Sequence, residues 1–229
     1  PAEWPPGTRL VWINSPGNPD GRVLDVDALR AAVARARELG AVIAGDECYA
    51  EFGWDEPWAS APIPSILDPR VVGDDHTDVL GVYSRGKQSN LAGYRAAFIA
   101  GDPVLIERLL TVRKHAGLML PAPVQAAMIA ALGDETHVAE QRERYRARRG
   151  ILRPALEAAG YRIDASEAGL YLWVTRGVDA WEDVARFADL GIVVGPGTFY
   201  GNGSPQHVRL STTATDAHIT EAARRISGE

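Results

Sequence analysis

The first hundred residues alternate between apolar runs and polar turns, with one amphipathic segment between the first two runs. The apolar runs predict strands over 8–15, 41–45, 78–84 and 95–101. Apolar residues at helical spacing predict a helix over 25–40, with Asp25 as its N-cap and Gly40 as its stop. This strand–helix–strand order favours an α/β fold with a buried, mostly parallel sheet.

From Pro103 onward the pattern becomes mostly helical, and strands return near the end of the chain. Helices are predicted over 103–117, 121–133 and about 135–160, then over 181–191 and from Asp216. Strands are predicted over 161–165 and 169–176, and a further strand within 207–215. We therefore expect an α/β part over 1–134, followed by a smaller α+β part over 135–229.

Composition narrows the class of protein. The 229 residues are 46% hydrophobic and carry a formal net charge of -6, which argues against a nucleic-acid binder. The one basic cluster, QRERYRARRG, contains an interleaved Glu and is interpreted as a solvated helix face. A single cysteine, Cys48, excludes a disulfide within the chain and suits a reducing compartment. With no apolar run long enough for a membrane span, we expect a cytoplasmic protein.

Polar residues follow several of the predicted strands, and open α/β sheets bind ligands at such strand ends. These residues are Asn18, Asp46 with Tyr49, Ser84 with Lys87, and, inside a later strand, Arg209. Each has a plain structural interpretation when taken singly. Asn18 precedes a proline as in many turns, and Lys87 could be a surface lysine. A buried Arg209 needs an acidic partner or a ligand.

The order of these residues is more specific than any one of them. NPxG, then DExY, then SxxK with an Arg eight residues after the Lys, then RLS, resembles the class I aminotransferases. These are fold type I enzymes that use pyridoxal 5'-phosphate (PLP). The resemblance extends from NSPGNPDG to VRLSTTATD. SNLAGYRAAFIAGD, VRKHAGLMLPAPVQAAM, GLYLW and PGTFYG are similar to the actinobacterial-type succinyldiaminopimelate aminotransferases of lysine biosynthesis.

The resemblance implies roles for residues around the PLP ring. Lys87 matches the lysine that forms the internal aldimine, and Asp46 matches the acid under the pyridine nitrogen. Tyr49 and Asn18 match the residues that hydrogen-bond the ring hydroxyl oxygen. Lys87, Asp46 and Tyr49 are the expected catalytic residues. Freed Lys87 would move the proton between the substrate carbon and the cofactor.

Three further roles concern anionic groups. Ser84 and Arg95 match two ligands of the PLP phosphate, since a hydroxyl and a guanidinium both donate hydrogen bonds to it. Arg209 matches the arginine that holds the substrate α-carboxylate, and Asn18 is expected beside it as a second substrate-binding residue. No metal site is expected.

The activity that the resemblance implies is amino-group transfer between an amino acid and 2-oxoglutarate by a ping-pong aldimine mechanism, with N-succinyl-diaminopimelate as a candidate donor. A homodimer is implied, with neither nucleic acid nor membrane as a partner. Two alternatives stay open: a PLP lyase or decarboxylase on the same fold, and a non-catalytic fragment. Family members carry a longer part before NPxG, so we expect this chain to be a fragment of the family fold.

Two residues depart from the usual family pattern. Arg85 stands between Ser84 and Lys87, where the family has an apolar or small residue. Its guanidinium either faces solvent or reaches the phosphate. Asp20 replaces the common Thr or Asn of the NPxG turn, and its carboxylate either lies near the cofactor site or points away.

Overall fold

The computed structural model describes residues 4–228. The chain forms two compact units, each built from separate segments. Unit 1 comprises Pro1–Pro16, Val23–Glu51 and Pro62–Ala139. Unit 2 comprises Gly17–Arg22, Phe52–Ala61 and Glu140–Glu229. Within the described residues, no helix combines the length and the apolar character that a membrane span requires.

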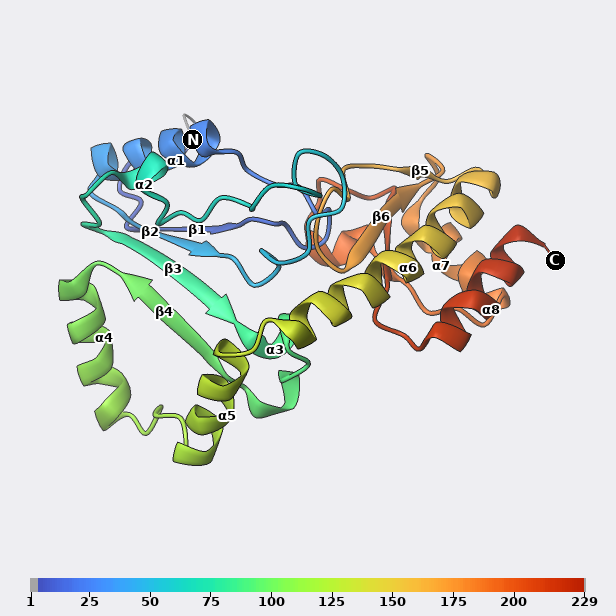
Figure 1. Cartoon of the computed structure of the whole chain (residues 1–229). Coiled ribbons are helices and arrows are strands. Elements are labelled where there is room, and N and C mark those ends of the chain that lie inside the picture. Colours follow the sequence, from blue (N-terminus) through green and yellow to red (C-terminus); the bar gives the residue numbers. More distant parts are fainter. Residues whose placement is uncertain (1–3, 229) are drawn as a thin grey trace. The chain divides into compact units, whose positions relative to one another are not determined.

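The centre of unit 1 is a four-stranded sheet with the order β1-β2-β3-β4 (Figure 1). Its strands are β1 (Leu10–Asn14), β2 (Val42–Asp46), β3 (Val79–Ser84) and β4 (Ala97–Gly101). The first three run parallel, and β4 runs antiparallel to β3. The predicted strands and the mostly parallel sheet are therefore confirmed. Because β2 lies between parallel neighbours, the carboxyl ends of β1, β2 and β3 share one edge of the sheet.

One face of this sheet is covered by α1 (Val26–Leu39) and the short α2 (Pro69–Val72) (Figure 1). Leu29 of α1 packs in one buried cluster with Ile43 of β2 and Val79 of β3, each no more than 2% exposed. Burial of a side chain of this size stabilises the fold by roughly 1.5–3 kcal/mol. This cluster fixes the sheet against α1 and so holds the strand ends in place.

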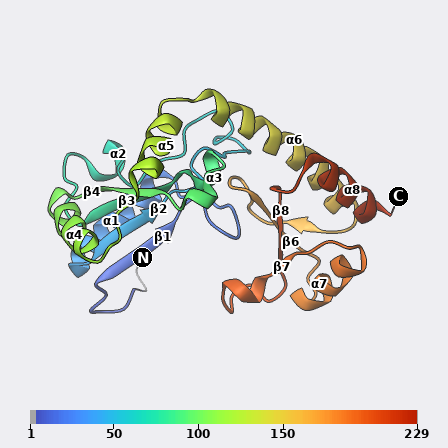
Figure 2. The same cartoon turned by 90° about the horizontal axis from the view of Figure 1, so that it is seen from below.

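The rest of unit 1 follows β3 along the chain, and Figure 2 shows it from below. It consists of α3 (Arg85–Gln88), the 3-10 turn η1 (Ala92–Tyr94), α4 (Pro103–His115) and α5 (Ala122–Leu132). The helices predicted after Pro103 are confirmed, whereas α3 was missed because one turn is too short to show helical spacing. None of the described residues of α4 is buried, so packing within the described chain contributes little to this helix.

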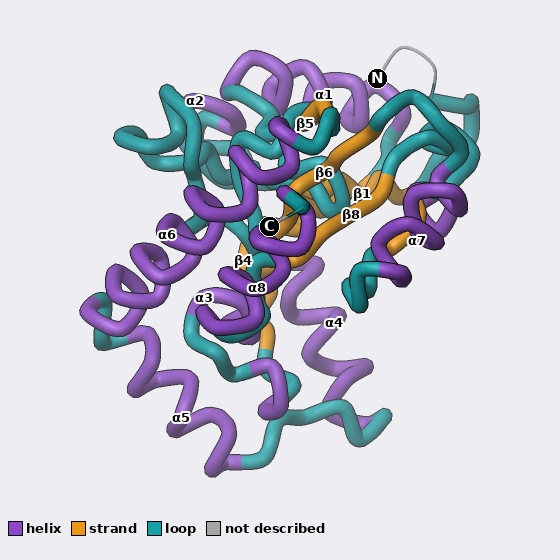
Figure 3. Tube along the Cα trace, turned by 90° about the vertical axis from the view of Figure 1, so that its right-hand side faces the viewer, coloured by secondary structure: helices purple, strands orange, loops and turns teal. Residues whose placement is uncertain are grey.

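Unit 2 is built on an antiparallel sheet with the order β5-β6-β8-β7. Its strands are β5 (Arg162–Ile163), β6 (Tyr171–Thr175), β7 (Gly195–Pro196) and β8 (Val208–Ser211). Figure 3 shows β6 and β8 side by side. Successive side chains along these strands point to opposite faces. Leu172 and Val208 enter the core, whereas Tyr171 and Arg209 lie on the other face.

The core face of that sheet is covered by three helices. They are α6 (Thr136–Ala158), α7 (Ala180–Asp189) and α8 (Asp216–Ser227), and a 3-10 turn, η2 (Gly197–Tyr200), follows β7. Leu156, Phe187 and Ile219 supply one side chain from each helix to a single buried cluster. The predicted strand–helix pattern of this part is confirmed, except that β7 and η2 were not predicted.

The basic cluster in α6 is only partly solvated, which corrects the sequence interpretation: Glu143 and Arg144 are exposed, whereas Arg149 is buried. Arg149 is only 8% exposed, lies 3.5 Å from a carboxylate oxygen of Asp55, and donates a hydrogen bond to the Ser166 carbonyl. Arg142 donates to the carbonyls of Gly53 and Ala59. The interleaved Glu suggested solvent exposure. These arginines instead donate hydrogen bonds to carbonyl groups of loops that are distant in sequence, and helical spacing cannot predict such contacts.

The predicted boundary at residues 134 and 135 differs in position from the change of unit, which falls between Ala139 and Glu140 inside α6. Two earlier segments, Gly17–Arg22 and Phe52–Ala61, also belong to unit 2. The Ser166 N–H donates to the Asp20 carbonyl, and the Trp54 indole donates to the Gly169 carbonyl. The assignment of 1–134 and 135–229 to the two domains of the family remains a prediction.

Helix α1 offers a matched test of its predicted cap. The Asp25 carboxylate accepts a hydrogen bond of 2.8 Å from the Ala28 N–H, and Gly40 ends the helix in the left-handed conformation. Asp25→Ala should therefore lower the free energy of unfolding by about 1 kcal/mol. Asp27 lies in the same turn but makes no capping hydrogen bond, so Asp27→Ala should lower the free energy of unfolding by only about a few tenths of 1 kcal/mol. Urea unfolding followed by circular dichroism compares the two, and equal effects would contradict the capping role.

Candidate active site

Five of the predicted site residues lie in unit 1, after the carboxyl ends of β2 and β3. Asp46 is the last residue of β2 and pairs in register with Val82 of β3. Tyr49 lies in the turn that follows β2 and is 3% exposed. Ser84 ends β3, Lys87 lies in α3, and Arg95 follows η1. Because β2 and β3 pair in parallel and the stretches from Asp46 to Tyr49 and from Ser84 to Arg95 are short, all five lie near the same edge of the sheet.

Lys87 sits on a single helical turn that is fixed at its start. The Ser84 Oγ caps α3 by accepting a hydrogen bond of 3.2 Å from the Gly86 N–H. A Cβ at residue 86 would lie 3.2 Å from the Ala92 Cα, so glycine allows the next loop to pack closely there. The Lys87 amine, which is partly buried, has no hydrogen-bond or ion-pair partner among the described residues. It is therefore available to react.

The charges of Asp46 and Lys87 both act on the pKa of the Cys48 thiol. The Cys48 backbone N–H donates a hydrogen bond of 3.3 Å to the Asp46 carboxylate. Burial raises the pKa of the Cys48 thiol to about 12, the Asp46 charge adds to the rise, and the Lys87 charge opposes it. The thiol thus lies within reach of both charges. A thiol with so high a pKa is a poor nucleophile near neutral pH, which agrees with the interpretation of Cys48 as a packed residue.

Glu47, beside Asp46, has a structural role that the sequence left undecided. Its Oε1 accepts hydrogen bonds of 2.6 Å from the Ile66 N–H and 3.0 Å from the Ser65 hydroxyl. Burial raises the pKa of this carboxyl, and the two hydrogen bonds oppose that rise. Glu47 therefore ties the segment after residue 62 to the end of β2, which leaves Asp46 as the acid at the strand end.

Arg95 is exposed and adopts a left-handed backbone conformation with a φ of 52°. Its NH1 group donates one hydrogen bond of 3.3 Å to the Ala92 carbonyl. A guanidinium has five N–H donors, so most of its hydrogen-bonding capacity remains for an anion.

Asn18 and Arg209, the remaining predicted site residues, both belong to unit 2 and meet there. The Arg209 NH1 group donates a hydrogen bond of 2.8 Å to the Asn18 Oδ1. The guanidinium carbon lies 3.9 Å from the ring centre of Tyr171 and 5.2 Å from that of Tyr200. The Arg209 Nε is buried and has no hydrogen-bond partner among the described residues. An unpaired guanidinium edge held between aromatic rings suits a carboxylate.

The two tyrosines around Arg209 were not predicted as site residues. Tyr200 makes an edge contact with Trp173, whose ring stacks on His207 at 5.1 Å. The His207 Nε2 lies 2.8 Å from an Asp164 carboxylate oxygen. Tyr171 and Tyr200 lie within the motifs GLYLW and PGTFYG, but only the fold shows that both rings flank the Arg209 guanidinium.

The two departures from the family pattern have structural explanations. Arg85 is 8% exposed, which excludes the solvent-facing alternative, and its guanidinium lies 5.6 Å from the ring centre of Tyr83. The Asp20 Oδ1 accepts a hydrogen bond of 3.2 Å from the Arg22 N–H, so this carboxylate stabilises its own turn.

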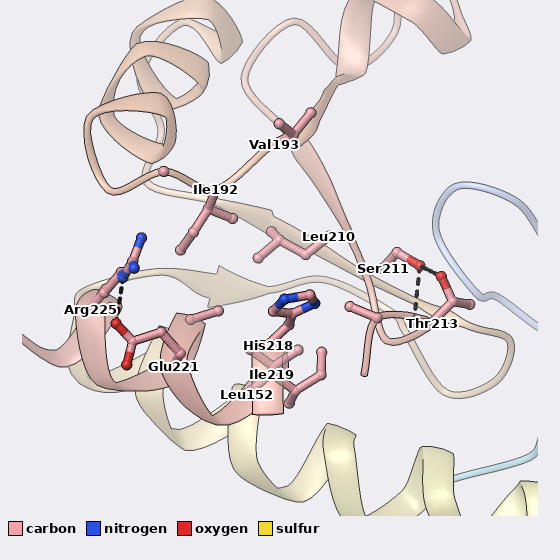
Figure 4. Close-up of a pocket in the computed structure, with 13 residues that line it drawn as sticks. Leu152, Ile192, Val193, Leu210, Ser211, Thr213, His218, Ile219, Glu221 and Arg225 are labelled. Atoms are coloured by element: carbon pink, nitrogen blue, oxygen red, sulfur yellow. Dashed lines mark hydrogen bonds and ion pairs between the residues drawn. The ribbon is translucent and has the colours of Figure 1, made fainter. Parts of the chain in front are cut away.

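A pocket of about 500 Å³ lies elsewhere in unit 2, between β8, α8 and the segment before β7 (Figure 4). Leu152, Leu210 and Ile219 contribute to its apolar lining, and the ion pair of Glu221 with Arg225 lies at one side. None of the predicted site residues lines it, so it is distinct from the residues considered above.

The reactivity of Cys48 tests the arrangement of Asp46 and Lys87 without any cofactor. Because the thiol pKa is about 12, iodoacetamide should label the native chain slowly at pH 8 and the urea-unfolded chain much faster. Asp46→Asn should speed native labelling, since it removes a charge that raises the thiol pKa, and Lys87→Ala should slow it. Asp27→Asn is the control. Fast native labelling that Asp46→Asn leaves unchanged would contradict this arrangement.

The chain is similar to named aminotransferases over nearly all of its length. It is 56% identical over 219 residues to the 4-dedimethylamino-4-oxo-anhydrotetracycline transaminase OxyQ of Streptomyces rimosus, covering 96% of this chain and 60% of that protein. It is 52% identical over 223 residues to "Probable aminotransferase Rv1178" of Mycobacterium tuberculosis, covering 97% of this chain and 52% of that protein. The chain thus spans between half and two thirds of these relatives.

Solved structures show the same fold. An aminotransferase from Neisseria meningitidis matches 96% of this chain and 57% of its own, with a TM-score of 0.86 and 31% identity. A structure named probable N-succinyldiaminopimelate aminotransferase, from Thermus thermophilus, matches 96% of this chain and 58% of its own, with a TM-score of 0.84 and 27% identity. These neighbours are fold type I enzymes that use PLP, so the predicted fold class is confirmed.

The model of the family "Aminotransferase class I and II" matches residues 2–226. This match extends across both units, from the residues before β1 to the last turn of α8. It includes the Lys87 turn, the end of β2 and the strand that carries Arg209. The chain belongs to the class I and II aminotransferases.

Proposed function

We propose that this chain forms part of a PLP-dependent aminotransferase. The observation that supports this most is the Lys87 amine, which lies without a partner among the described residues on a capped turn, while its charge and that of Asp46 both act on the Cys48 thiol. The family match gives this pair its chemical meaning. Because the chain spans only part of its relatives, the activity itself is part of the proposal.

The side chains at this edge of unit 1 fit the groups of PLP. An amine from Lys87 suits the aldehyde, and a carboxylate from Asp46 suits the pyridine nitrogen. The hydroxyl of Ser84 and the guanidinium of Arg95, with its unused donors, suit the phosphate. Tyr49, which is buried in the turn after Asp46, is proposed to hold the ring hydroxyl oxygen.

When bound, PLP supplies an aldehyde for the amino group and a ring that withdraws electrons from the substrate carbon. The protein's own residues then have defined tasks. Lys87 would bond to the aldehyde and, once displaced by the substrate amine, would accept the proton from the substrate α-carbon and pass it to the carbon that came from the aldehyde. The Asp46 carboxylate keeps the pyridine nitrogen protonated. The second half of the reaction repeats these steps in reverse with a 2-oxo acid.

Arg209 is proposed to bind the α-carboxylate of both substrates. The hydrogen bond to Asn18 uses one N–H of the guanidinium, and its remaining donors can bind a carboxylate. The ring faces of Tyr171 and Tyr200 attract the cation and restrict its rotation. A carboxylate held in this way is retained through the reaction, which disfavours the α-decarboxylase alternative.

The proposed substrates are an amino acid and 2-oxoglutarate. N-succinyl-diaminopimelate, and with it a place in lysine biosynthesis, is the proposed donor, and the likeness to the Thermus thermophilus structure supports it. OxyQ, at 56% identity, is named for a tetracycline intermediate, so a polycyclic ketone acceptor is the second candidate. A cytoplasmic homodimer belongs to the same proposal. Donor and acceptor pairs should be screened together for new keto acid and amine.

Lys87→Ala tests the proposed nucleophile. Lys87 and Lys114 are the only lysines of the chain, so each variant leaves one of them. The wild-type chain and Lys114→Ala should develop a visible absorbance band with added PLP, and borohydride should remove it. Lys87→Ala should show no such band. A band that survives in Lys87→Ala would refute the assignment, and its absence from the wild-type chain would favour the non-catalytic alternative.

Tyr171 tests the proposed carboxylate site. Tyr171→Leu removes the ring that lies 3.9 Å from the Arg209 guanidinium, whereas Tyr171→Phe keeps it. Loss of a cation–π contact of about 1 kcal/mol should raise the KM for the amino donor roughly fivefold in Tyr171→Leu. Tyr171→Phe should remain close to the wild type. Equal KM values in all three proteins, measured in single-turnover reactions with donor alone, would argue against the role of the ring.

A further inference from the structure

Three side chains of unit 1 form a hydrogen-bonded chain that ends beside the Lys87 turn. The His137 Nε2 lies 2.8 Å from the Ser89 Oγ, and the His137 Nδ1 lies 3.1 Å from an Asp134 carboxylate oxygen. His137 lies in the first turn of α6 and Asp134 lies two residues before this helix, whereas Ser89 directly follows α3. The contact therefore joins segments that lie 48 positions apart in the sequence.

The negative charge of Asp134 determines which groups donate and which accept in these hydrogen bonds. Asp134 accepts a hydrogen bond of 2.8 Å from the Thr136 N–H. That bond, followed by the contact with His137, holds the pKa of the Asp134 carboxyl below its usual range. As a carboxylate, Asp134 only accepts, so the His137 Nδ1 carries the hydrogen. In the neutral imidazole, Nε2 then accepts from the Ser89 hydroxyl.

Ser89 fixes the end of the turn that carries Lys87. Its backbone N–H donates a hydrogen bond of 3.0 Å to the Arg85 carbonyl, which closes α3. The preceding residue, Gln88, is 4% exposed and accepts a hydrogen bond from the Tyr83 hydroxyl. A single helical turn has little stability of its own, because nucleation costs more than one hydrogen bond returns. The position of Lys87 therefore depends on these side-chain contacts.

We propose that Asp134, His137 and Ser89 form a positioning network for Lys87. The start of α6 holds Ser89, Ser89 holds the end of α3, and α3 presents the Lys87 amine. None of the three residues needs to touch substrate or cofactor for this role. The proposal rests on the proposed function for the importance of Lys87, but the contact between Ser89 and His137 can be tested without it.

A Ser–His–Asp chain also has the order of a hydrolytic nucleophile, base and orienting acid. Such chemistry needs N–H donors aimed at a developing oxyanion. The Ser89 N–H is already bonded to the Arg85 carbonyl, so it cannot serve as one. The geometry therefore favours the positioning role.

The test uses the complete chain and two measurements. Amide hydrogen exchange over residues 85–90 needs no cofactor, and an absorbance titration with PLP reports the use of Lys87. Loss of one hydrogen bond of about 1 kcal/mol corresponds to a change of roughly fivefold. His137→Ala and Ser89→Ala should each speed exchange in this segment and raise the half-saturating PLP concentration by about that factor. The double variant should change no further.

Two further variants separate hydrogen bonding from packing. His137→Gln keeps an amide that can bond to Ser89 and should restore most of the wild-type exchange and PLP titration. His115→Ala, an exposed histidine at the end of α4, should behave as the wild type. Unchanged exchange in His137→Ala and Ser89→Ala would overturn the network, and so would additive effects in the double variant or failure of the Gln rescue.

The outcomes also distinguish this inference from the proposed function. If exchange responds as expected but the wild-type chain shows no PLP band, the network stands as a structural tie and its proposed purpose fails together with the proposed function. If the wild-type chain binds PLP and no variant alters either measurement, the proposed function survives and the network is refuted.

Discussion

Parallel pairing of β1, β2 and β3 is the constraint on which unit 1 depends. Central strands of such a sheet must be apolar on both faces, so polar side chains first become possible where the strands end. Asp46 and Ser84 occupy those ends. The core cluster around Leu29 and Ile43 fixes the strands, and the strands fix the spacing of the polar groups. The burial of the strands therefore confines polar side chains to this edge of the sheet.

In unit 2, the alternation of side chains along antiparallel strands determines the face on which Arg209 lies. Leu172 and Leu210 face the helices, and the same alternation turns Tyr171 and Arg209 to the opposite face. A guanidinium in such a position costs free energy unless it is paired, and here Asn18 and two aromatic rings compensate it only in part. The buried Nε of Arg209 has no hydrogen-bond partner among the described residues.

The regular elements could be predicted from the sequence because periodicity reports burial. Asp25 and Gly40 marked both ends of α1 correctly, and the apolar runs located β1 to β4. What could not be predicted depends on contacts between distant segments. The burial of Arg149, the tie from Glu47 to Ile66 and the contact of His137 with Ser89 leave no trace in local spacing. The order of the polar motifs was specific enough to identify the family even so.

The central claim is that Lys87 is the residue that takes up PLP. Peptide mapping of the wild-type chain after PLP and borohydride tests it most directly, because Lys114 is the only other lysine and serves as an internal reference. If Lys87 takes up PLP, the peptide that contains Lys87 should carry the pyridoxyl phosphate mass, and the peptide that contains Lys114 should carry little or none. Equal modification of the two lysines, or modification of Lys114 alone, would contradict it.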